Sequence, residues 1–130
     1  MRLAFALALV LASCAGPPPG EEGGVVGDPP LYYEVVGDGG PAVVVLHGGP
    51  GLSHDYLRPE WDRLARPGRR VVYYDQRGCG RSGAAAPYGW HEDVADLDRV
   101  VRRVSPDRPV VLAGSSWGPW LALLYARAHP

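Results

Sequence analysis

The chain has 130 residues, of which 46% are hydrophobic, and a formal net charge of −1 at pH 7. This length fits one small domain and falls short of the roughly 200–250 residues of larger α/β architectures. The near-neutral charge gives no electrostatic reason to expect a nucleic-acid partner, and the two cysteines do not form a disulfide framework.

The N-terminus predicts an exported protein with a lipid anchor. Arg2 precedes an apolar run over residues 3–11, which is too short for the ~20 residues that span a bilayer. The run ends in Leu-Ala-Ser-Cys, which resembles the bacterial lipobox, where the chain is cut before the cysteine and the thiol receives lipid. We expect residues 1–13 to be a signal peptide and Cys14 to hold the protein at the membrane of a bacterial cell envelope. An ordinary secretory signal with an incidental cysteine, or a misplaced start codon, is the alternative.

Residues 14–30 are rich in proline, glycine and acidic side chains, with almost nothing to bury. Such a composition predicts a flexible tether. We therefore expect the folded domain to comprise residues 31–130.

Strand-forming and helix-forming segments alternate in that domain. Strands are predicted at 31–36, 42–46, 70–74 and 109–113, and helices at 54–65, 90–104 and 117–128. The continuous apolar runs of the later strands suit a parallel sheet that is covered on both faces. This alternation predicts an α/β fold with a mostly parallel sheet and a ligand site at the carboxyl ends of the strands.

The segment that joins the last strand to the last helix contains a candidate nucleophile. Residues 114–118, Gly-Ser-Ser-Trp-Gly, fit the pattern G-x-S-x-G in one frame, with Ser116 at its centre. This pattern is typical of the nucleophile elbow of α/β hydrolases, where a sharp turn lifts the serine oxygen clear of the backbone. Gly114 and Gly118 would keep the crowded turn free of bulk, and the helix N-terminus would supply N–H groups where negative charge develops. A serine in any tight glycine turn is the alternative.

A second glycine-rich segment follows the strand at 42–46. It reads His47-Gly48-Gly49-Pro50-Gly51. A backbone that brings its N–H groups to a substrate oxygen cannot carry bulky side chains at that point. On its own, however, the segment is better explained as an ordinary glycine-proline turn.

A third glycine-rich segment, DQRGCGRS at residues 75–82, follows the strand at 70–74. Gly78, Gly80 and Gly83 have the spacing of a dinucleotide fingerprint, but that fingerprint must open a helix, whereas an Ala-Pro segment follows here. We therefore expect no cofactor and no metal at this loop. Asp75 and Arg77 are expected to brace the loop rather than to take part in chemistry.

Together, HGGPG, DQRGCGRS and GSSWG resemble the proline iminopeptidases, serine peptidases of the α/β-hydrolase superfamily that release N-terminal proline. The resemblance runs from about residue 31 to residue 130 and covers less than half of a full family member. It implies that Ser116 is the nucleophile and that the N–H groups of Gly49 and Trp117 form the oxyanion hole, with a small peptide or acyl compound as substrate. Ser115 stands where the family commonly has glycine, and the Pro-Trp pair at 119–120 replaces smaller residues.

The partners of a catalytic serine are not found after Ser116. No acidic residue follows it, and the one later histidine, His129, lies at the far end of the same predicted helix, roughly 20 Å away. We therefore expect the chain to be the N-terminal half of an α/β-hydrolase fold, truncated after the elbow helix and inactive on its own. Another serine esterase or acyl hydrolase, and a non-catalytic lipoprotein module, are the alternatives.

Overall fold

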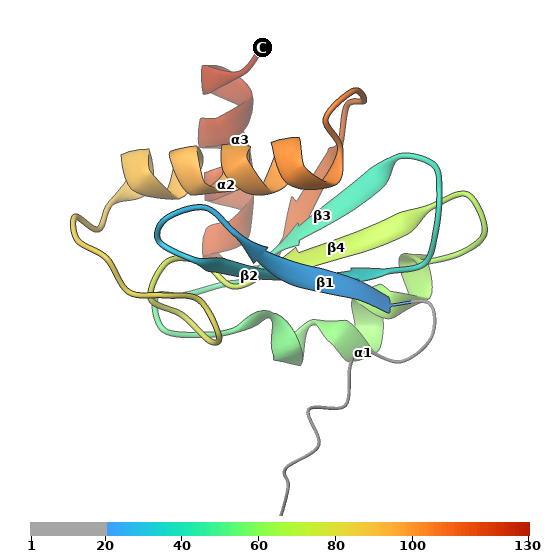
Figure 1. Cartoon of the computed structure of the whole chain (residues 1–130), viewed down its shortest axis with the longest axis horizontal. Helices are drawn as coiled ribbons and strands as arrows, with labels where there is room; N and C mark the ends of the chain where they lie inside the picture. The colour runs from blue at the N-terminus through green and yellow to red at the C-terminus, as the bar shows by residue number, and fades with distance from the viewer. Residues whose placement is uncertain (1–20) are drawn as a thin grey trace, which may run out of the picture.

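The computed structural model describes residues 21–130, which form a five-stranded sheet with helices on both faces (Figure 1). The strands are β1 (Glu21–Val26), β2 (Leu31–Val36), β3 (Ala42–Leu46), β4 (Arg70–Tyr74) and β5 (Val111–Gly114), in the order β1-β2-β4-β3-β5. Strand β3 is parallel to both β4 and β5, whereas β2 is antiparallel to β1 and to β4. The predicted α/β fold is confirmed.

The helices lie in the connections β3–β4 and β4–β5 and in the segment after β5. The helices are η1 (His54–Tyr56), α1 (Arg58–Trp61), η2 (Asp62–Leu64), α2 (Trp90–Val104) and α3 (Trp117–Ala128). The predicted helix at 54–65 is divided into three short pieces, and Pro59 lies in the first turn of α1, where a missing N–H costs little. None of the helices in the described part of the chain is both long and apolar enough to cross a bilayer.

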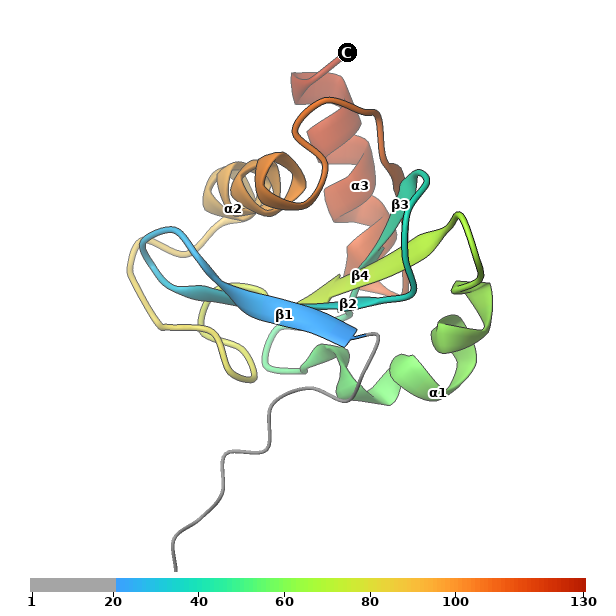
Figure 2. The same ribbon diagram turned by 45° about the vertical axis from the view of Figure 1, so that its right-hand side comes forward.

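The central strands bury side chains on both of their faces. Val44, Leu46 and Tyr74 belong to a core with α2 and α3, while Val45 and Tyr73 belong to a second core on the opposite face, beside α1. Figure 2 shows α2 and α3 on one side of the sheet and α1 on the other. Successive residues of a strand point to opposite faces, so only a continuous apolar run can fill both cores.

The first strand corrects the predicted tether. Residues 21–26 form β1, which pairs with the whole of β2, and the tether prediction is therefore wrong for this part of the chain. The pairing depends on the backbone rather than on buried side chains: a Cβ atom on Gly23 would lie 2.9 Å from the carbonyl oxygen of Tyr33. The predicted signal peptide at 1–13 and the lipidated Cys14 lie outside the described residues.

The last strand lies at the edge of the sheet. Strand β5 pairs with β3 and begins two residues later than predicted, at Val111, whose side chain is 54% exposed. The apolar side chains of this strand are thus only partly covered by the described residues.

Candidate active site

Ser116 has an unusual backbone conformation. Its φ of 56° and ψ of −106° make it the only residue other than glycine with a positive φ in the range 21–130. Such a conformation costs about 1–3 kcal/mol and persists where the surrounding structure enforces it, most often at functional sites. The residue stands between the end of β5 at Gly114 and the start of α3 at Trp117, at a sharp strand-to-helix turn.

The end of β3 enforces this turn. The Ser115 amide donates to the carbonyl oxygen of Leu46 at 3.1 Å, so the elbow crosses directly over that strand end. A Cβ atom on Gly114 would lie 2.4 Å from the same oxygen, and one on Gly118 would lie 2.2 Å from it. Both glycines are therefore required by close packing against the backbone of β3.

The segment after β3 meets the elbow, although the two are far apart in sequence. A Cβ atom on Gly48 would lie 3.1 Å from the Cβ of Ser116 and 3.2 Å from the hydroxyl oxygen of Tyr56. The Gly48 amide donates to that Tyr56 hydroxyl at 2.8 Å. The turn has two further backbone features: the Gly49–Pro50 peptide is cis, and Gly51 has a φ of 86°.

His47 links this segment to the loop after β4. Its Nε2 accepts a hydrogen bond from the Gln76 amide at 2.9 Å, and its carbonyl oxygen accepts one from the Gln76 side chain at 2.7 Å. Burial lowers the pKa of His47, so the imidazole is neutral at pH 7, with its proton on Nδ1 beside the Gly48 carbonyl oxygen. Because Nε2 is occupied, His47 is a positioning residue and not a base for Ser116.

Gly49 and Trp117, the predicted oxyanion-hole residues, line one hollow beside the elbow, which we call the elbow hollow. Its volume is about 350 Å³. Its walls are Gly49, Pro50, Gln76, Arg77, Cys79, Tyr88, Gly89, Trp90, Asp93 and Trp117. The three glycine-rich segments and the start of α2 therefore contribute to one site at the carboxyl ends of β3 and β4, where an α/β sheet binds its ligands.

Asp75 ties the loop after β4 to η1. Its buried carboxylate accepts hydrogen bonds from the Arg81 amide at 2.8 Å and from the His54 amide and Nδ1 at 3.0 and 2.8 Å. Gly80 has to be glycine here, because a Cβ atom would lie 2.2 Å from Asp75 Oδ2. Sequence reasoning missed the role of His54, which carries no local signal for a partner 21 residues away.

The pKa values of Asp75 and His54 are both shifted from their usual values. Burial acts to raise the pKa of Asp75, but the hydrogen bonds from His54 and Arg81 outweigh it and hold the pKa below its usual value. Burial acts to lower the pKa of His54, but Asp75 and the carboxylate of Glu34, 3.4 Å from Nε2, outweigh it and raise the pKa. The fully buried His54 is thus a structural residue, with Nδ1 hydrogen-bonded to Asp75 and Nε2 facing the carboxylate of Glu34.

Arg77 forms a second buried pair across the elbow hollow. Its Nε and Nη2 donate to the two carboxylate oxygens of Asp96, each at 2.9 Å, and its Nη1 donates to the carbonyl oxygens of Ala85 and Pro87. Asp96 lies on α2 and is 1% exposed. Asp96 lies four residues before the buried Val100 and so on the same helix face, but sequence reasoning missed its pairing with Arg77, 19 residues away.

The other glycine of this loop packs against an aromatic side chain. A Cβ atom on Gly78, which has a φ of 68°, would lie 3.1 Å from the ring of Tyr88. The amide of Gly78 donates to the carbonyl oxygen of Gly83, so the loop closes on itself before α2 begins. Gly78 and Gly80 therefore serve close packing within the loop.

The structure does not bring a base to Ser116 from the described residues. His129 stacks on Tyr125 at the far end of α3, and His91 stacks on Trp90. In residues 21–130 the Ser116 hydroxyl itself makes no hydrogen bond. A serine without a base stays protonated near neutral pH and is a weak nucleophile.

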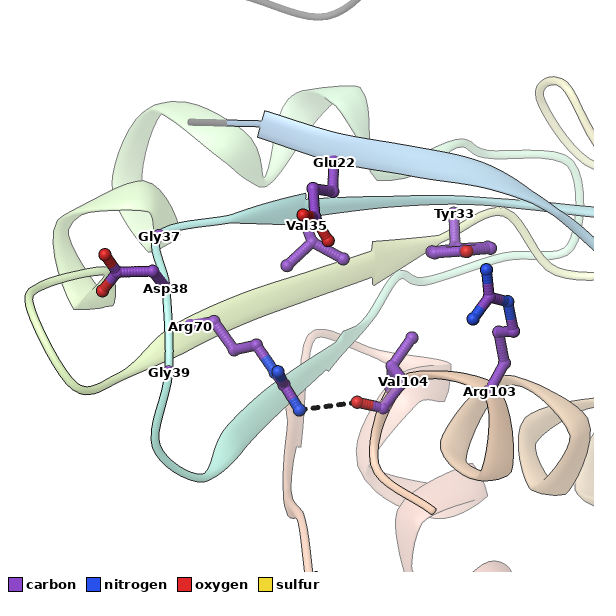
Figure 3. Close-up of a pocket in the computed structure, with 9 residues that line it drawn as sticks. All are labelled: Glu22, Tyr33, Val35, Gly37, Asp38, Gly39, Arg70, Arg103 and Val104. Carbon is purple, nitrogen blue, oxygen red and sulfur yellow. Dashed lines mark hydrogen bonds between the residues drawn. The ribbon is translucent and has the colours of Figure 1, made fainter. Parts of the chain in front are cut away.

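A second hollow, of about 440 Å³, lies at the opposite end of the sheet (Figure 3). There Arg70, the first residue of β4, donates from Nη2 to the carbonyl oxygen of Val104 at 2.6 Å, and Arg103 lies over the ring of Tyr33. This hollow sits at the amino end of β4, away from the elbow, and its two arginines close the end of α2 against the sheet. The elbow hollow is therefore the candidate active site.

A mixed sheet whose parallel strands β3, β4 and β5 end at a strained serine is the architecture of an α/β hydrolase. The sequence model of the alpha/beta hydrolase fold matches residues 41–130, and the chain belongs to that family.

Within the family, the chain is similar to proline iminopeptidases. It is 45% identical over 86 residues to the proline iminopeptidase of Thermoplasma volcanium, which covers 65% of this chain and 29% of that protein. It is 46% identical over 101 residues to the enzyme of Levilactobacillus brevis, which covers 72% and 33%. The crystal structure of a proline iminopeptidase-related protein from Thermus thermophilus superposes with a TM-score of 0.73 at 38% identity, over 85% of this chain and 41% of that one. The chain thus spans well under half the length of these relatives.

Proposed function

We propose that this chain is the nucleophile-bearing part of a serine hydrolase of the proline iminopeptidase type, which releases N-terminal proline from peptides. The observation that carries the proposal is the backbone of Ser116, which is held at a positive φ between β5 and α3 by the carbonyl oxygen of Leu46. Strain of this kind at a serine, rather than at a glycine, has a functional explanation, since a glycine would occupy the same turn at lower cost. The similarity to proline iminopeptidases supports the choice of substrate.

The proposed reaction is acyl transfer through Ser116. The Ser116 hydroxyl oxygen attacks the carbonyl carbon of the substrate's N-terminal residue, and the carbonyl oxygen becomes an oxyanion. The N–H groups of Gly49 and Trp117 stabilise that charge; the latter stands at the first turn of α3, where amides lack helical partners. A general base takes the proton of the Ser116 hydroxyl and gives it to the leaving nitrogen as the tetrahedral intermediate collapses. The scissile bond breaks, the shortened peptide leaves with a free amine, and water hydrolyses the acyl-enzyme that remains.

We further propose that the base and its orienting acid belong to the part of the relatives' length that this chain does not span, since it covers 29% and 33% of two of them. His47 and His54 are engaged with other groups, and no acid follows Ser116 in the printed sequence. General-base assistance contributes about 10²–10⁴-fold to rate, so the 130 residues alone would have no measurable peptidase turnover. The proposal includes export and anchoring to the cell envelope through a lipid on Cys14, for which mass spectrometry of the mature N-terminus is the test.

The test of the nucleophile compares four proteins on a proline arylamide, with a simple ester in parallel. They are the 130-residue chain, the longest product of the gene, and that product with Ser116→Ala or, as a matched control, Ser115→Ala. We expect turnover in the long product, retained turnover in the Ser115 control, and a loss of at least about 10³-fold in Ser116→Ala.

Three results would contradict parts of the proposal. Turnover by the 130-residue chain would remove the need for a distant base. Full activity of Ser116→Ala would exclude that serine as nucleophile. Cleavage of the ester alone would replace the peptidase by an esterase.

A further inference from the structure

Two successive peptide planes lie between the end of β3 and the amide of Gly49. The first plane joins His47 to Gly48, the second joins Gly48 to Gly49, and both peptides are trans. In a trans peptide the carbonyl oxygen and the N–H point in opposite directions from one rigid plane. A partner that holds one of these groups therefore also fixes the direction of the other.

The first plane is held on both sides. The His47 carbonyl oxygen accepts a hydrogen bond from the Gln76 side chain at 2.7 Å, and the Gly48 amide donates to the Tyr56 hydroxyl at 2.8 Å. His47 and Gly48 are buried, whereas Tyr56 is 47% exposed. The first plane thus has a buried partner on one side and a half-exposed one on the other.

The second plane is held on one side only. The Gly48 carbonyl oxygen lies 2.5 Å from Nδ1 of His47, which carries the proton because Nε2 accepts a hydrogen bond from the Gln76 amide. Within residues 21–130 the amide of Gly49 donates no hydrogen bond. The N–H of Gly49 is therefore the one polar group of the two planes that is left for a substrate oxygen.

The loop after β4 holds these planes by two routes. Gln76 contacts the first plane directly. Asp75, its neighbour, binds the amide and Nδ1 of His54, the first residue of η1, and Tyr56 is the last residue of the same short helix. The position of the Tyr56 hydroxyl is thus tied through η1 to the DQRGCGRS loop.

We propose that Tyr56 and Gln76 are positioning residues that fix the direction of the Gly49 amide for the oxyanion. This inference rests on the proposed function, and it assigns that function two residues that act through Gly49 rather than on the substrate. The held segment lies directly against the nucleophile, since a Cβ atom on Gly48 would lie 3.1 Å from the Cβ of Ser116. A donor that is already oriented needs no rearrangement when the charge develops, so loss of either contact lowers the rate of the chemical step.

The main test is Tyr56→Phe in the longest product of the gene, because this change removes one oxygen from a half-exposed ring. Tyr125→Phe is the matched control: its hydroxyl donates to Asp98 at 3.2 Å, between α2 and α3. For both the proline arylamide and the simple ester, we expect Tyr56→Phe to lower kcat by about tenfold and to leave KM within about twofold. The Tyr125 control should change neither constant.

A second readout follows Ser116 without turnover. An alkyl fluorophosphonate labels a reactive serine as fluoride leaves, and the phosphoryl oxygen then takes the place of the oxyanion. We expect Tyr56→Phe to slow labelling by about tenfold, at an unchanged melting temperature and an unchanged final extent of labelling. Gln76→Met, which keeps the length of the side chain without its donor, should lower kcat and the labelling rate in the same way.

Other outcomes overturn the inference. An unchanged kcat and labelling rate in Tyr56→Phe would exclude the positioning role. A rise in KM without a fall in kcat would assign the residue to substrate binding instead. A lower final extent of labelling, with a normal rate for the fraction that reacts, would mean that the variant is partly unfolded and that the residue is only structural.

The two proposals fail in different ways. Ser116-dependent turnover that Tyr56→Phe leaves unchanged would retain the hydrolase and reject the positioning role. Ser116-dependent labelling that Tyr56→Phe slows, without turnover of either substrate, would retain the positioning role and reject the proposed reaction. The absence of Ser116-dependent labelling would reject both.

Discussion

Two glycine-rich segments have opposite properties in this molecule. In the DQRGCGRS loop, Asp75, Arg77 and Ser82 all have hydrogen-bond partners, and the residues with positive φ are glycines. In the GSSWG elbow, the residue with positive φ is Ser116, whose hydroxyl has no partner among the described residues. Backbone strain at an exposed serine indicates a reacting position, whereas hydrogen-bonded polar groups and relaxed glycines indicate a structural role.

The largest expected effect comes from removing the buried ion pair that holds the DQRGCGRS loop. Asp96→Asn would leave the guanidinium of Arg77 buried beside a neutral amide, and we expect a loss of about 3–5 kcal/mol in the free energy of unfolding. Urea unfolding measures it. The matched control is Glu60→Gln, which removes an exposed ion pair with Arg63 and should cost no more than about 1 kcal/mol. Equal effects of the two variants would mean that the buried pair does not brace the loop.

Disrupting the packing of the elbow should lower the free energy of unfolding somewhat less. Gly118→Ala places a methyl group 2.2 Å from the backbone oxygen of Leu46, and we expect a loss of about 2–3 kcal/mol because two backbone segments must separate. Gly24→Ala is the control, because its nearest neighbour is the side chain of Tyr33 at 3.3 Å, which can shift. Thermal unfolding compares them, and a harmless Gly118→Ala would show that the elbow is not pressed against β3.

Most of the fold that carries these two segments was predicted from the sequence. The strands at 31–36, 42–46 and 70–74 and the helices at 90–104 and 117–128 have the predicted bounds, because apolar runs and helical spacing fix them locally. Strand β1 was not predicted, since four of its six residues are glycine or glutamate and it is held mainly by backbone pairing with β2, with Val26 packed against the core.

The site was predicted in its parts but not in its connections. The elbow followed from a pattern of five residues, and the two other glycine-rich segments followed from their positions after strands. The pairs of His54 with Asp75 and of Arg77 with Asp96 depend on the approach of segments 21 and 19 residues apart, which one sequence does not reveal. The position of Asp93 in the wall of the elbow hollow was likewise not predicted, because the residues that line the hollow come from distant parts of the sequence.

The pair of His54 and Asp75 also predicts that the free energy of unfolding depends on pH. The pKa of His54 is raised in the folded state, so its contribution is complete below its unfolded value of about 6.5 and is lost as pH rises through the folded value. The pKa of Asp75 is lowered, so its contribution is present above about 3.9 and is lost as pH falls. We expect the difference in unfolding free energy between wild type and His54→Gln to shrink above pH 6.5, and that between wild type and Asp75→Asn to shrink below pH 4. Urea titrations at several pH values measure both differences, and flat profiles would contradict the network.

The smallest expected effect is a gain in stability at the elbow. Ser116→Gly removes the steric cost of a positive φ, about 1–3 kcal/mol, and adds the entropic cost of a glycine, about 0.5–1 kcal/mol, so the variant should be more stable by about 1 kcal/mol. Ser115→Gly is the control: Ser115 does not have a positive φ, so this variant pays the entropic cost without relieving strain. Thermal melts should therefore move in opposite directions for the two neighbouring serines, and Ser116→Gly should also lose turnover in the long gene product. A melting temperature that falls equally in both variants would mean that Ser116 is not strained, and the difference between the elbow and the loop would then rest on the unpaired hydroxyl alone.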